Sequence, residues 1–357
     1  MPKIYLLFFL TYFSLIISLE TKKDLFDATQ YKNMKMKNRV FKGAVIDYES
    51  WEDGKLTEKY YKRYEELSKK EIGTIITGVM LVEENKAFPI PMIDKDEYIN
   101  QFKKMTDSVH KNGANIIAQI SIIRDFDMTV EEIHRIINLF AETAERCKKA
   151  GFDGVEIAAN HHGTLSQYLS PLFNHRTDEY GGSEENRARF VIEIIKKVRQ
   201  RVGEDYIILL KINSEDDDPN GITSEQFIRS CKLAEQAGVD MIEITGMKWK
   251  KHRDNTLVYF DIGKILSNII KIPVIITGGA KDLNVINDAL NNSNIQYIGI
   301  CRALLSEPDL LIKWKNCEDK KSQRVSCMNC YKFENQNEVE CILNTKKKKN
   351  LGKKNNS

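Results

Sequence analysis

The sequence predicts an α/β fold, and within that class a (β/α)8 TIM barrel. Eight apolar runs alternate with helical stretches between Leu25 and about residue 317, and a chain of 357 residues is long enough to bury one large core. The runs are residues 39–45, 73–78, 115–121, 153–158, 206–213, 240–245, 273–278 and 296–301. Their nearly continuous apolar character is typical of parallel strands covered by helices. Eight such units predict a closed barrel with its active site at the carboxyl ends of the strands.

The segments between the runs carry helix boundaries. Thr129 with Glu132 forms a capping-box pattern before an amphipathic stretch that stops at Gly151. The pattern recurs at Thr223 with Gln226. A doubly wound sheet is the alternative fold, but no G-x-G-x-x-G follows an early strand.

The two ends of the chain differ from its middle. Residues 1–19 hold one lysine and then an apolar run, which indicates a signal peptide, with an uncleaved membrane anchor or a non-targeting leader as the alternatives. We assign residues 24–317 to the barrel, 318–345 to a cysteine-containing extension and 346–357 to a basic, disordered tail. The formal net charge of +3 is too balanced to indicate a nucleic-acid partner, and membrane contact is expected only through the first segment. No pattern indicates an oligomeric state.

Residues 153–182 hold the most specific sequence motifs in the chain. DGVEIA is followed by a loop with His161 and His162, then by LSQYLSP and RTDEYGGSEENR. These motifs resemble the central region of the Old Yellow Enzyme family, the FMN-dependent NAD(P)H:flavin oxidoreductases, and the resemblance spans roughly residues 25–345. It implies an FMN cofactor, NAD(P)H as reductant and a small-molecule electron acceptor such as a quinone or an α,β-unsaturated carbonyl.

The resemblance assigns the flavin's ring to residues at the ends of several strands. Gln119 matches a glutamine whose amide can donate to and accept from the pyrimidine ring. Lys211 stands where the family is basic, and its charge would stabilise the reduced flavin. An unpaired ammonium inside a barrel is costly, so a lysine at this position indicates a functional role. Main chain at Gly43, Ala44, Gly78 and Val79 is expected to lie against the ring.

The last two units match the family's phosphate-binding segments. IPVIITGGAKD supplies Gly278 and Gly279, and IGICRALL supplies Cys301 and Arg302. Glycines let main chain approach a phosphate, while the arginine adds charge and donors. Cys301 replaces the family's usual glycine, so the approach there is expected to be tighter.

The substrate side departs from the family's pattern. Relatives carry two carbonyl-binding side chains, followed by a proton-donating tyrosine. Ungapped alignment places Ala158, His161 and Gly163 at these three positions, so only His161 keeps a catalytic, substrate-binding side chain. His162 could supply the second donor from a rearranged loop, or be a solvated surface residue. Tyr48 matches a substrate-pocket tyrosine of some relatives.

Two further departures concern the cover of the site. Ile46 replaces a Thr or Cys that tunes the ring in relatives, and residues 120–128 are shorter than the family's covering loop. The resulting site is expected to be more open to water.

Three function hypotheses follow. The first is an FMN-dependent NAD(P)H oxidoreductase that favours acceptors needing no positioned proton. The second is a flavin-binding pseudoenzyme, suggested by Ala158 and Gly163. The third is an aldolase or isomerase in which Lys211 forms a Schiff base.

The cysteine-bearing extension also resembles part of the family. Cys327, Cys330 and Cys341 are similar to the cysteine-rich end of relatives that bind an iron–sulfur cluster, but Phe333 stands where one ligand is expected. We interpret this as a degenerate, metal-free site; in an oxidising compartment the first two cysteines could form a disulfide. The leader points to the secretory pathway or a membrane anchor, whereas the resemblance implies the cytoplasm.

Overall fold

The protein is described from a computed structural model that covers residues 22–46, 51–52, 55–85, 90–247 and 256–324, with Cys327, Cys330 and Cys341. The expected leader and basic tail, and Tyr48, lie outside these residues. Within the described residues, no helix is both long enough and apolar enough to cross a bilayer.

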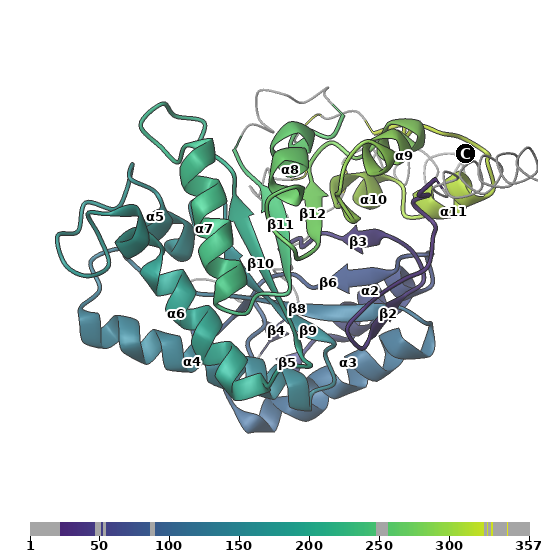
Figure 1. The fold of residues 1–357 in the computed structure, drawn as a ribbon. Coiled ribbons are helices and arrows are strands. Elements are labelled where there is room, and N and C mark those ends of the chain that lie inside the picture. The colour runs from purple at the N-terminus through teal and green to yellow at the C-terminus, as the bar shows by residue number, and fades with distance from the viewer. Residues whose placement is uncertain are drawn as a thin grey trace, which may run out of the picture.

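Eight parallel strands close into a barrel, as the sequence predicts (Figure 1). They are β3 (Val40–Lys42), β6 (Thr74–Ile76), β8 (Asn115–Ser121), β9 (Gly154–Ala159), β10 (Ile207–Asn213), β11 (Met241–Thr245), β12 (Val274–Thr277) and β13 (Tyr297–Ile300). The pairing of β3 with β13 closes the ring. A short strand β7 (Met80–Leu81) extends the second unit and pairs with the end of β8.

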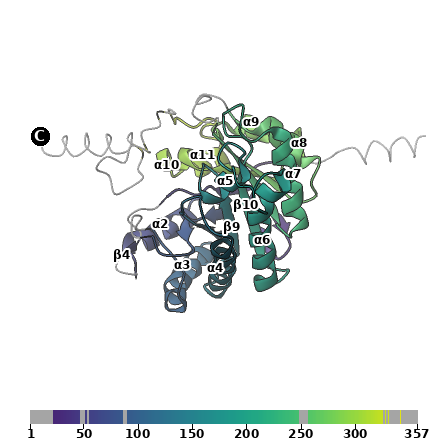
Figure 2. The same cartoon turned by 90° about the vertical axis from the view of Figure 1, so that its left-hand side faces the viewer.

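Helices follow the strands and cover the outside of the barrel (Figures 1 and 2). The larger ones are α2 (Glu58–Ser68), α3 (Ile99–Lys111), α4 (Val130–Lys149), α6 (Glu184–Val202), α7 (Ser224–Gln236), α8 (Phe260–Ser267) and α9 (Leu283–Asn291). Both expected capping boxes are present, at the starts of α4 and α7. Gly151 and Gly238 follow these helices with φ of +83° and +102°, values that favour glycine.

Shorter elements complete the fold. They are the 3-10 turn η1 (Asp96–Tyr98), α5 (Thr164–Leu169), α10 (Arg302–Ser306), α11 (Leu310–Lys315) and the hairpin β4 (Trp51–Glu52) with β5 (Lys55–Leu56). A second hairpin, β1 (Thr29–Tyr31) with β2 (Met34–Met36), precedes the barrel. Met34 and Met36 pack with inward side chains at the starts of the barrel strands, among them Met241. This hairpin therefore closes the amino-terminal end, and the opposite end is left for a site.

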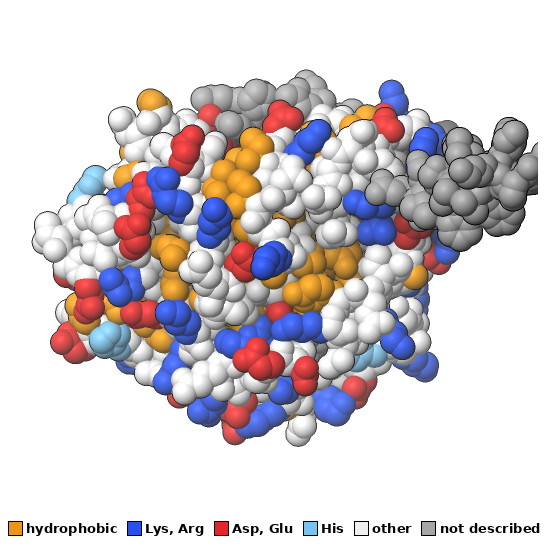
Figure 3. Space-filling model, in the orientation of Figure 1, with side chains coloured by type: hydrophobic (Ala, Val, Ile, Leu, Met, Phe, Trp, Pro, Cys, Tyr) orange, Lys and Arg blue, Asp and Glu red, His pale blue; other side chains and the backbone are white. Residues whose placement is uncertain are grey.

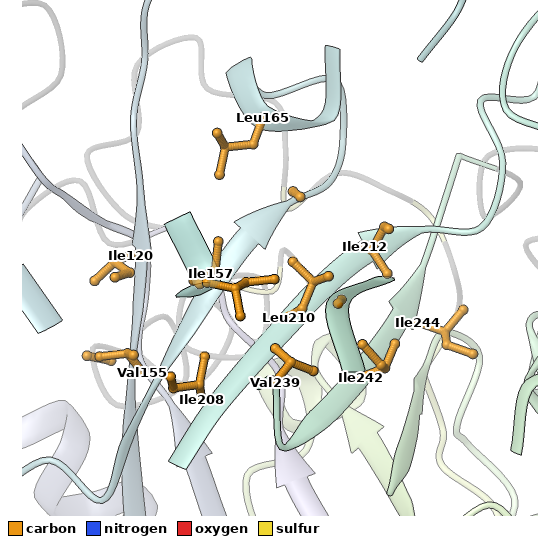
Figure 4. Packing of buried hydrophobic residues seen from close by; sticks show 14 of the residues in the cluster. Ile120, Val155, Ile157, Leu165, Ile208, Leu210, Ile212, Val239, Ile242 and Ile244 are labelled. Carbon is orange, nitrogen blue, oxygen red and sulfur yellow. The ribbon is translucent and has the colours of Figure 1, made fainter. Parts of the chain in front are cut away.

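Alternation along β10 separates the core from the site. Ile208, Leu210 and Ile212 pack against the helices with neighbours such as Val155 and Ile157 (Figure 4). Ile207 and Leu209 belong instead to the cluster inside the barrel. Because successive residues of a strand face opposite sides, Lys211 continues the inward series towards the carboxyl end.

The surface mixes charges of both signs with apolar areas (Figure 3). The face drawn there shows lysine and arginine interspersed with acidic side chains over the outer helices. Such mixing agrees with the near-neutral balance of the composition.

Candidate active site

A cavity of about 330 Å³ opens at the carboxyl ends of the strands. It falls in the size range of small-molecule sites, roughly 300–1,000 Å³. Residues from the ends of β9 to β13 line it, together with Ala44 and Ile46 after β3. Seven of the residues predicted from the sequence meet here: Ala44, His161, Lys211, Gly278, Gly279, Cys301 and Arg302.

Positive charge dominates the lining. Lys211, Lys281, Arg302 and Arg324 all contribute, and no carboxylate of the described residues does. Gly278 and Gly279 bring main chain to the same wall, with φ of +154° and +80°. Cationic side chains beside exposed main chain are what a phosphate group requires.

Gly278 and Gly299 have neighbours so close that a side chain at either position would clash. A Cβ on Gly278 would lie 2.9 Å from the ring of Tyr259, and one on Gly299 would lie 1.7 Å from Oγ1 of Thr277. Both glycines line the cavity, so their missing side chains keep its wall open. At Gly43 the neighbour is Cys301, whose Cβ would be 3.3 Å from an added Cβ. The tighter phosphate approach expected at Cys301 stays a prediction.

Lys211 takes part in a buried ion pair beneath the cavity. Its Nζ lies 2.6 Å from Oε1 of Glu243 on the adjacent strand β11. Nearby, Nε2 of Gln119 donates to Oε2 of Glu156 over 2.6 Å. The carboxyl groups of Glu156 and Glu243 also act on each other: Glu243 raises the pKa of Glu156, and Glu156 lowers that of Glu243.

Burial and charge act in opposite directions on these groups. Burial alone would lower the pKa of Lys211, but Glu243 and Glu156 outweigh it and raise that pKa. Burial, reinforced by Glu243, raises the pKa of Glu156 well above its usual range. Burial would also raise the pKa of Glu243, yet Lys211 outweighs it and holds that carboxyl ionised. Lys211 is therefore a permanent cation at neutral pH.

The family resemblance assigns substrate binding and proton donation to positions 158, 161 and 163, which we call the clamp positions, and His161 is the one of them that lines the cavity. It follows β9 in a left-handed conformation (φ +52°), and its main-chain N–H donates to Oδ1 of Asn213 over 3.1 Å. Nε2 of the ring lies 3.3 Å from Oγ1 of Thr245. Burial of the ring, and then the charges of Lys211 and Arg302, lower its pKa. The residue is solvent-exposed overall, which moderates the effect of burial, but both cations act in the same direction. The ring is thus neutral at neutral pH and can donate from one nitrogen.

The other clamp positions supply no donor side chain. Ala158 is buried at the end of β9, and Gly163 precedes α5 as its N-cap. His162 does not replace them, because it lies outside the cavity lining, with its ring against Phe173 and Nε2 at 3.7 Å from Oδ1 of Asp216. The idea that His162 acts as a second donor therefore finds no support in this geometry.

Comparison with known proteins shows the family to which the chain belongs. The NADH:flavin oxidoreductase / NADH oxidase family, an FMN family, matches residues 24–124 and 121–320. The chain belongs to this family. NADPH dehydrogenase of Bacillus subtilis is 30% identical over 80% of this chain and 92% of its own length.

Other relatives extend further than this chain. N,N-dimethylglycine/sarcosine dehydrogenase of Chromohalobacter salexigens is 29% identical over 81% of this chain but 48% of its own length. Cinnamate reductase of Clostridium sporogenes is 28% identical over 90% of this chain and 57% of its own length. The chain thus spans about half the length of these curated relatives.

Solved structures confirm the barrel. A 2-naphthoyl-CoA reductase superposes with a TM-score of 0.76 at 23% identity, covering 85% of this chain and 54% of that one. An old yellow enzyme homologue from Zymomonas mobilis gives a TM-score of 0.72 at 18% identity, covering 85% and 95%. At these identities the likeness speaks for the fold alone.

Some residues assigned from the family resemblance lie beside the cavity rather than in its wall. An added Cβ on Gly43 would lie 3.3 Å from Cβ of Cys301, and the amide of Gln119 donates to Glu156. Gly78 and Val79 fall in the break between β6 and β7, where the N–H of Gly78 donates to the hydroxyl of Tyr64 over 2.7 Å. Contact of these residues with a flavin stays a prediction, as does the role of Tyr48.

The structure adds residues that motif reasoning missed. Thr245, Thr277 and Tyr259 line the cavity, as do Lys281 and Arg324. The C-terminal extension brings Arg324 there, because Ser322 N–H donates to the carbonyl of Lys281 over 2.8 Å. Glu156 and Glu243 could have been recognised in the sequence as buried acids, since each is the one acidic residue of an apolar strand.

The cysteines of the extension show no metal site in the described part of the chain. No group of three or more His, Cys, Asp or Glu side chains there could hold an ion. Cys327, Cys330 and Cys341 are free thiols in this structure. The region between Cys330 and Cys341 lies outside the described residues, so the assignment of a degenerate site stays a prediction.

Proposed function

We propose that this protein is an FMN-dependent NAD(P)H oxidoreductase that reduces an electron-poor small molecule. The observation that carries the proposal is the meeting of Lys211, Gly278 and Arg302 in one cavity at the carboxyl end of the barrel. Its family is named for NADH:flavin oxidoreduction, and the Bacillus subtilis relative is named NADPH dehydrogenase. When bound, FMN supplies a ring that takes up hydride from NAD(P)H and passes it to an acceptor.

The residues present suit this cofactor. Arg302, aided by Lys281 and Arg324, would hold the phosphate, and main chain at Gly278 and Gly279 would approach it. Lys211 would place its ammonium group beside the end of the ring that becomes negative on reduction. His161, with a neutral ring, would donate a hydrogen bond to an acceptor oxygen.

The acceptor class follows from what the clamp lacks. Ala158 and Gly163 offer neither a second carbonyl donor nor a proton for an alkene carbon. Loss of one donor to a developing oxyanion typically costs about 10²–10³ in rate, and loss of a positioned acid about 10²–10⁴. We therefore propose a quinone, or another acceptor that needs no positioned proton, in preference to an α,β-unsaturated carbonyl.

The charge state of Lys211 argues against a Schiff-base aldolase. An amine must lose its proton to attack a carbonyl, and nucleophilic lysines have lowered pKa values. The ion pair with Glu243 instead raises the pKa of Lys211. The second candidate function is a flavin-binding pseudoenzyme. Ala158 and Gly163 favour it, because neither residue supplies the donor or the acid that relatives carry at these positions.

Anaerobic reduction of the full chain loaded with FMN separates these functions. The proposal predicts that NADPH or NADH bleaches the yellow colour, and that a quinone restores it faster than cyclohexenone does. Bleaching by neither nicotinamide would favour the pseudoenzyme. Failure of the purified chain to retain or take up FMN would contradict both.

A further inference from the structure

Four buried side chains form a single network under the cavity. Lys211 and Glu243 are 4% and 0% exposed, and Gln119 and Glu156 are 6% and 0% exposed. They come from the adjacent strands β8, β9, β10 and β11. Gln119 is the register partner of Glu156, and Lys211 is the register partner of Glu243. We call these four residues the buried charge network.

The network contains one cation and two carboxyl groups. Two ionised carboxylates in contact in a dry interior repel strongly, so such pairs retain a proton. Within the described residues, Oε1 of Glu156 and both carboxyl oxygens of Glu243 are buried without a hydrogen-bond partner, although Nζ of Lys211 lies 2.6 Å from Oε1 of Glu243. A proton on Oε1 of Glu156 would supply the missing hydrogen bond to Glu243.

We infer that Glu156 and Glu243 share one proton and one negative charge, and that this charge neutralises Lys211 at the cavity wall. The two acids are positioning residues, because Lys211 lines the cavity and neither carboxylate does. The amide of Gln119 donates to Oε2 of Glu156 and so holds that oxygen in place. The inference rests on the proposed function, since it concerns how strongly Lys211 would act on bound FMN.

The groups that face the two acids come from every surrounding strand. Lys211 on β10 and Gln119 on β8 are joined by Thr277 on β12, which lowers the pKa of Glu243. Cys301, which follows β13, faces Lys211. Among the described groups found to act on Glu156 and Glu243, Lys211 is the one cation. Removing one acid therefore leaves the other to balance it, whereas removing both leaves Lys211 unopposed.

The test compares the two single variants with the double variant. We expect Glu156→Gln/Glu243→Gln to bind reduced FMN, relative to oxidised FMN, about tenfold more tightly than wild type, a positive shift of about 30 mV in the two-electron midpoint potential. The physical reason is that an unopposed ammonium stabilises the negative reduced ring. The single variants should fall between the double variant and wild type, with Glu243→Gln the larger because it removes the direct contact. Dye-equilibration titration of the FMN-loaded chain measures each potential.

Glu145→Gln is the matched control for loss of one carboxylate. Glu145 pairs with Arg201 on the outer helices, far from the network in the fold, so the potential should stay at the wild-type value. A double variant whose affinity ratio stays within about threefold of wild type would overturn the inference.

An infrared measurement tests the shared proton without FMN. The cofactor-free wild type should show the carbonyl stretch of a protonated carboxyl group at neutral pH, and Glu156→Gln should lose it. Absence of that band in wild type overturns the inference, even where the double variant does not fold. A chain that never binds FMN but shows the band would instead contradict the proposed function.

Discussion

Nζ of Lys211 lies 2.6 Å from Oε1 of Glu243, and both side chains are almost fully buried. A buried ion pair contributes little net stability, but removing one partner leaves an uncompensated charge. The pair therefore ties the electrostatics of the site to the stability of the barrel.

Removal of the cation alone should destabilise the protein. Lys211→Met leaves Glu243 without its counter-ion, and breaking a buried pair in this way typically costs about 3–5 kcal/mol. Urea unfolding of cofactor-free protein measures the change in the free energy of unfolding. Lys211→Met/Glu243→Gln should regain most of the loss, and Lys70→Met, which breaks an exposed pair with Asp309, should cost about 0–1 kcal/mol. Equal costs for the two lysines would contradict the buried-pair argument.

The phosphate assignment predicts a difference between two ligands. Arg302→Met should weaken FMN binding by roughly 10- to 100-fold, because a hydrogen bond to a charged group is worth about 1.5–3 kcal/mol. Riboflavin has the same ring without the phosphate, so its affinity should change much less. Fluorescence titration gives both dissociation constants. An equal loss for both ligands would show that Arg302 acts on the ring or on folding instead.

Two histidines should titrate on opposite sides of their ordinary pKa of 6.5. The hydrogen bond that the His110 ring donates to Asp153 raises the pKa of His110, so its stabilising effect is full below pH 6.5 and is lost as pH rises through the raised value. The pKa of His161 is lowered, so its neutral ring costs stability as pH falls below 6.5. Histidine-labelled NMR should show His110 titrating and His161 unchanged over most of the range from roughly pH 8 to 5. Titration of His161 near pH 6.5 would contradict a ring whose pKa is lowered by burial and by the charges of Lys211 and Arg302.

Restoring the clamp should restore alkene reduction. Ala158→His/Gly163→Tyr supplies the missing donor and acid, and we expect enone turnover relative to quinone turnover to rise by about 10² or more. The backbone at Gly163 (φ −64°, ψ +165°) accepts a side chain, and an added Cβ would come no closer than 3.2 Å, to the carbonyl of Asn160.

Ala158→His/Gly163→Phe is the control, since it has the same bulk without the hydroxyl. Equal rates for the Tyr and Phe variants would mean that position 163 does not face the acceptor.

A methyl group at Gly299 should disturb both the fold and the site. Gly299→Ala would force Thr277 to move, and overpacking of this kind typically costs about 1–3 kcal/mol. Thr277→Ala/Gly299→Ala should recover part of the loss because the nearest atom, Oγ1, is removed. Thermal unfolding checks both variants, and an unaffected Gly299→Ala protein would show that the contact is easily relieved.

The barrel could be predicted from the sequence because its signals are local. Each strand is a short apolar run, and Thr129 and Thr223 begin helices with capping boxes that the structure contains. The expected strand at residues 39–45 is shorter in the structure, since β3 spans Val40–Lys42 before the chain turns into the cavity wall.

The site could be predicted only in part. Lys211, Arg302 and the glycine pair carry motifs, so their convergence followed from strand order. The contact of Arg324 with the same cavity depends on how the C-terminal extension folds back, which no periodic pattern encodes. His162 was ambiguous for the same reason, because its direction depends on the left-handed turn that it shares with His161.

The central claim is that this cavity holds FMN and uses it to oxidise NAD(P)H. Stopped-flow absorbance of the FMN-loaded chain, mixed without oxygen with NADPH or NADH, tests it most directly. The account predicts one FMN per chain and loss of the oxidised flavin absorbance with at least one nicotinamide. A chain that binds no FMN, or that binds it and leaves it oxidised with both nicotinamides, would contradict the account.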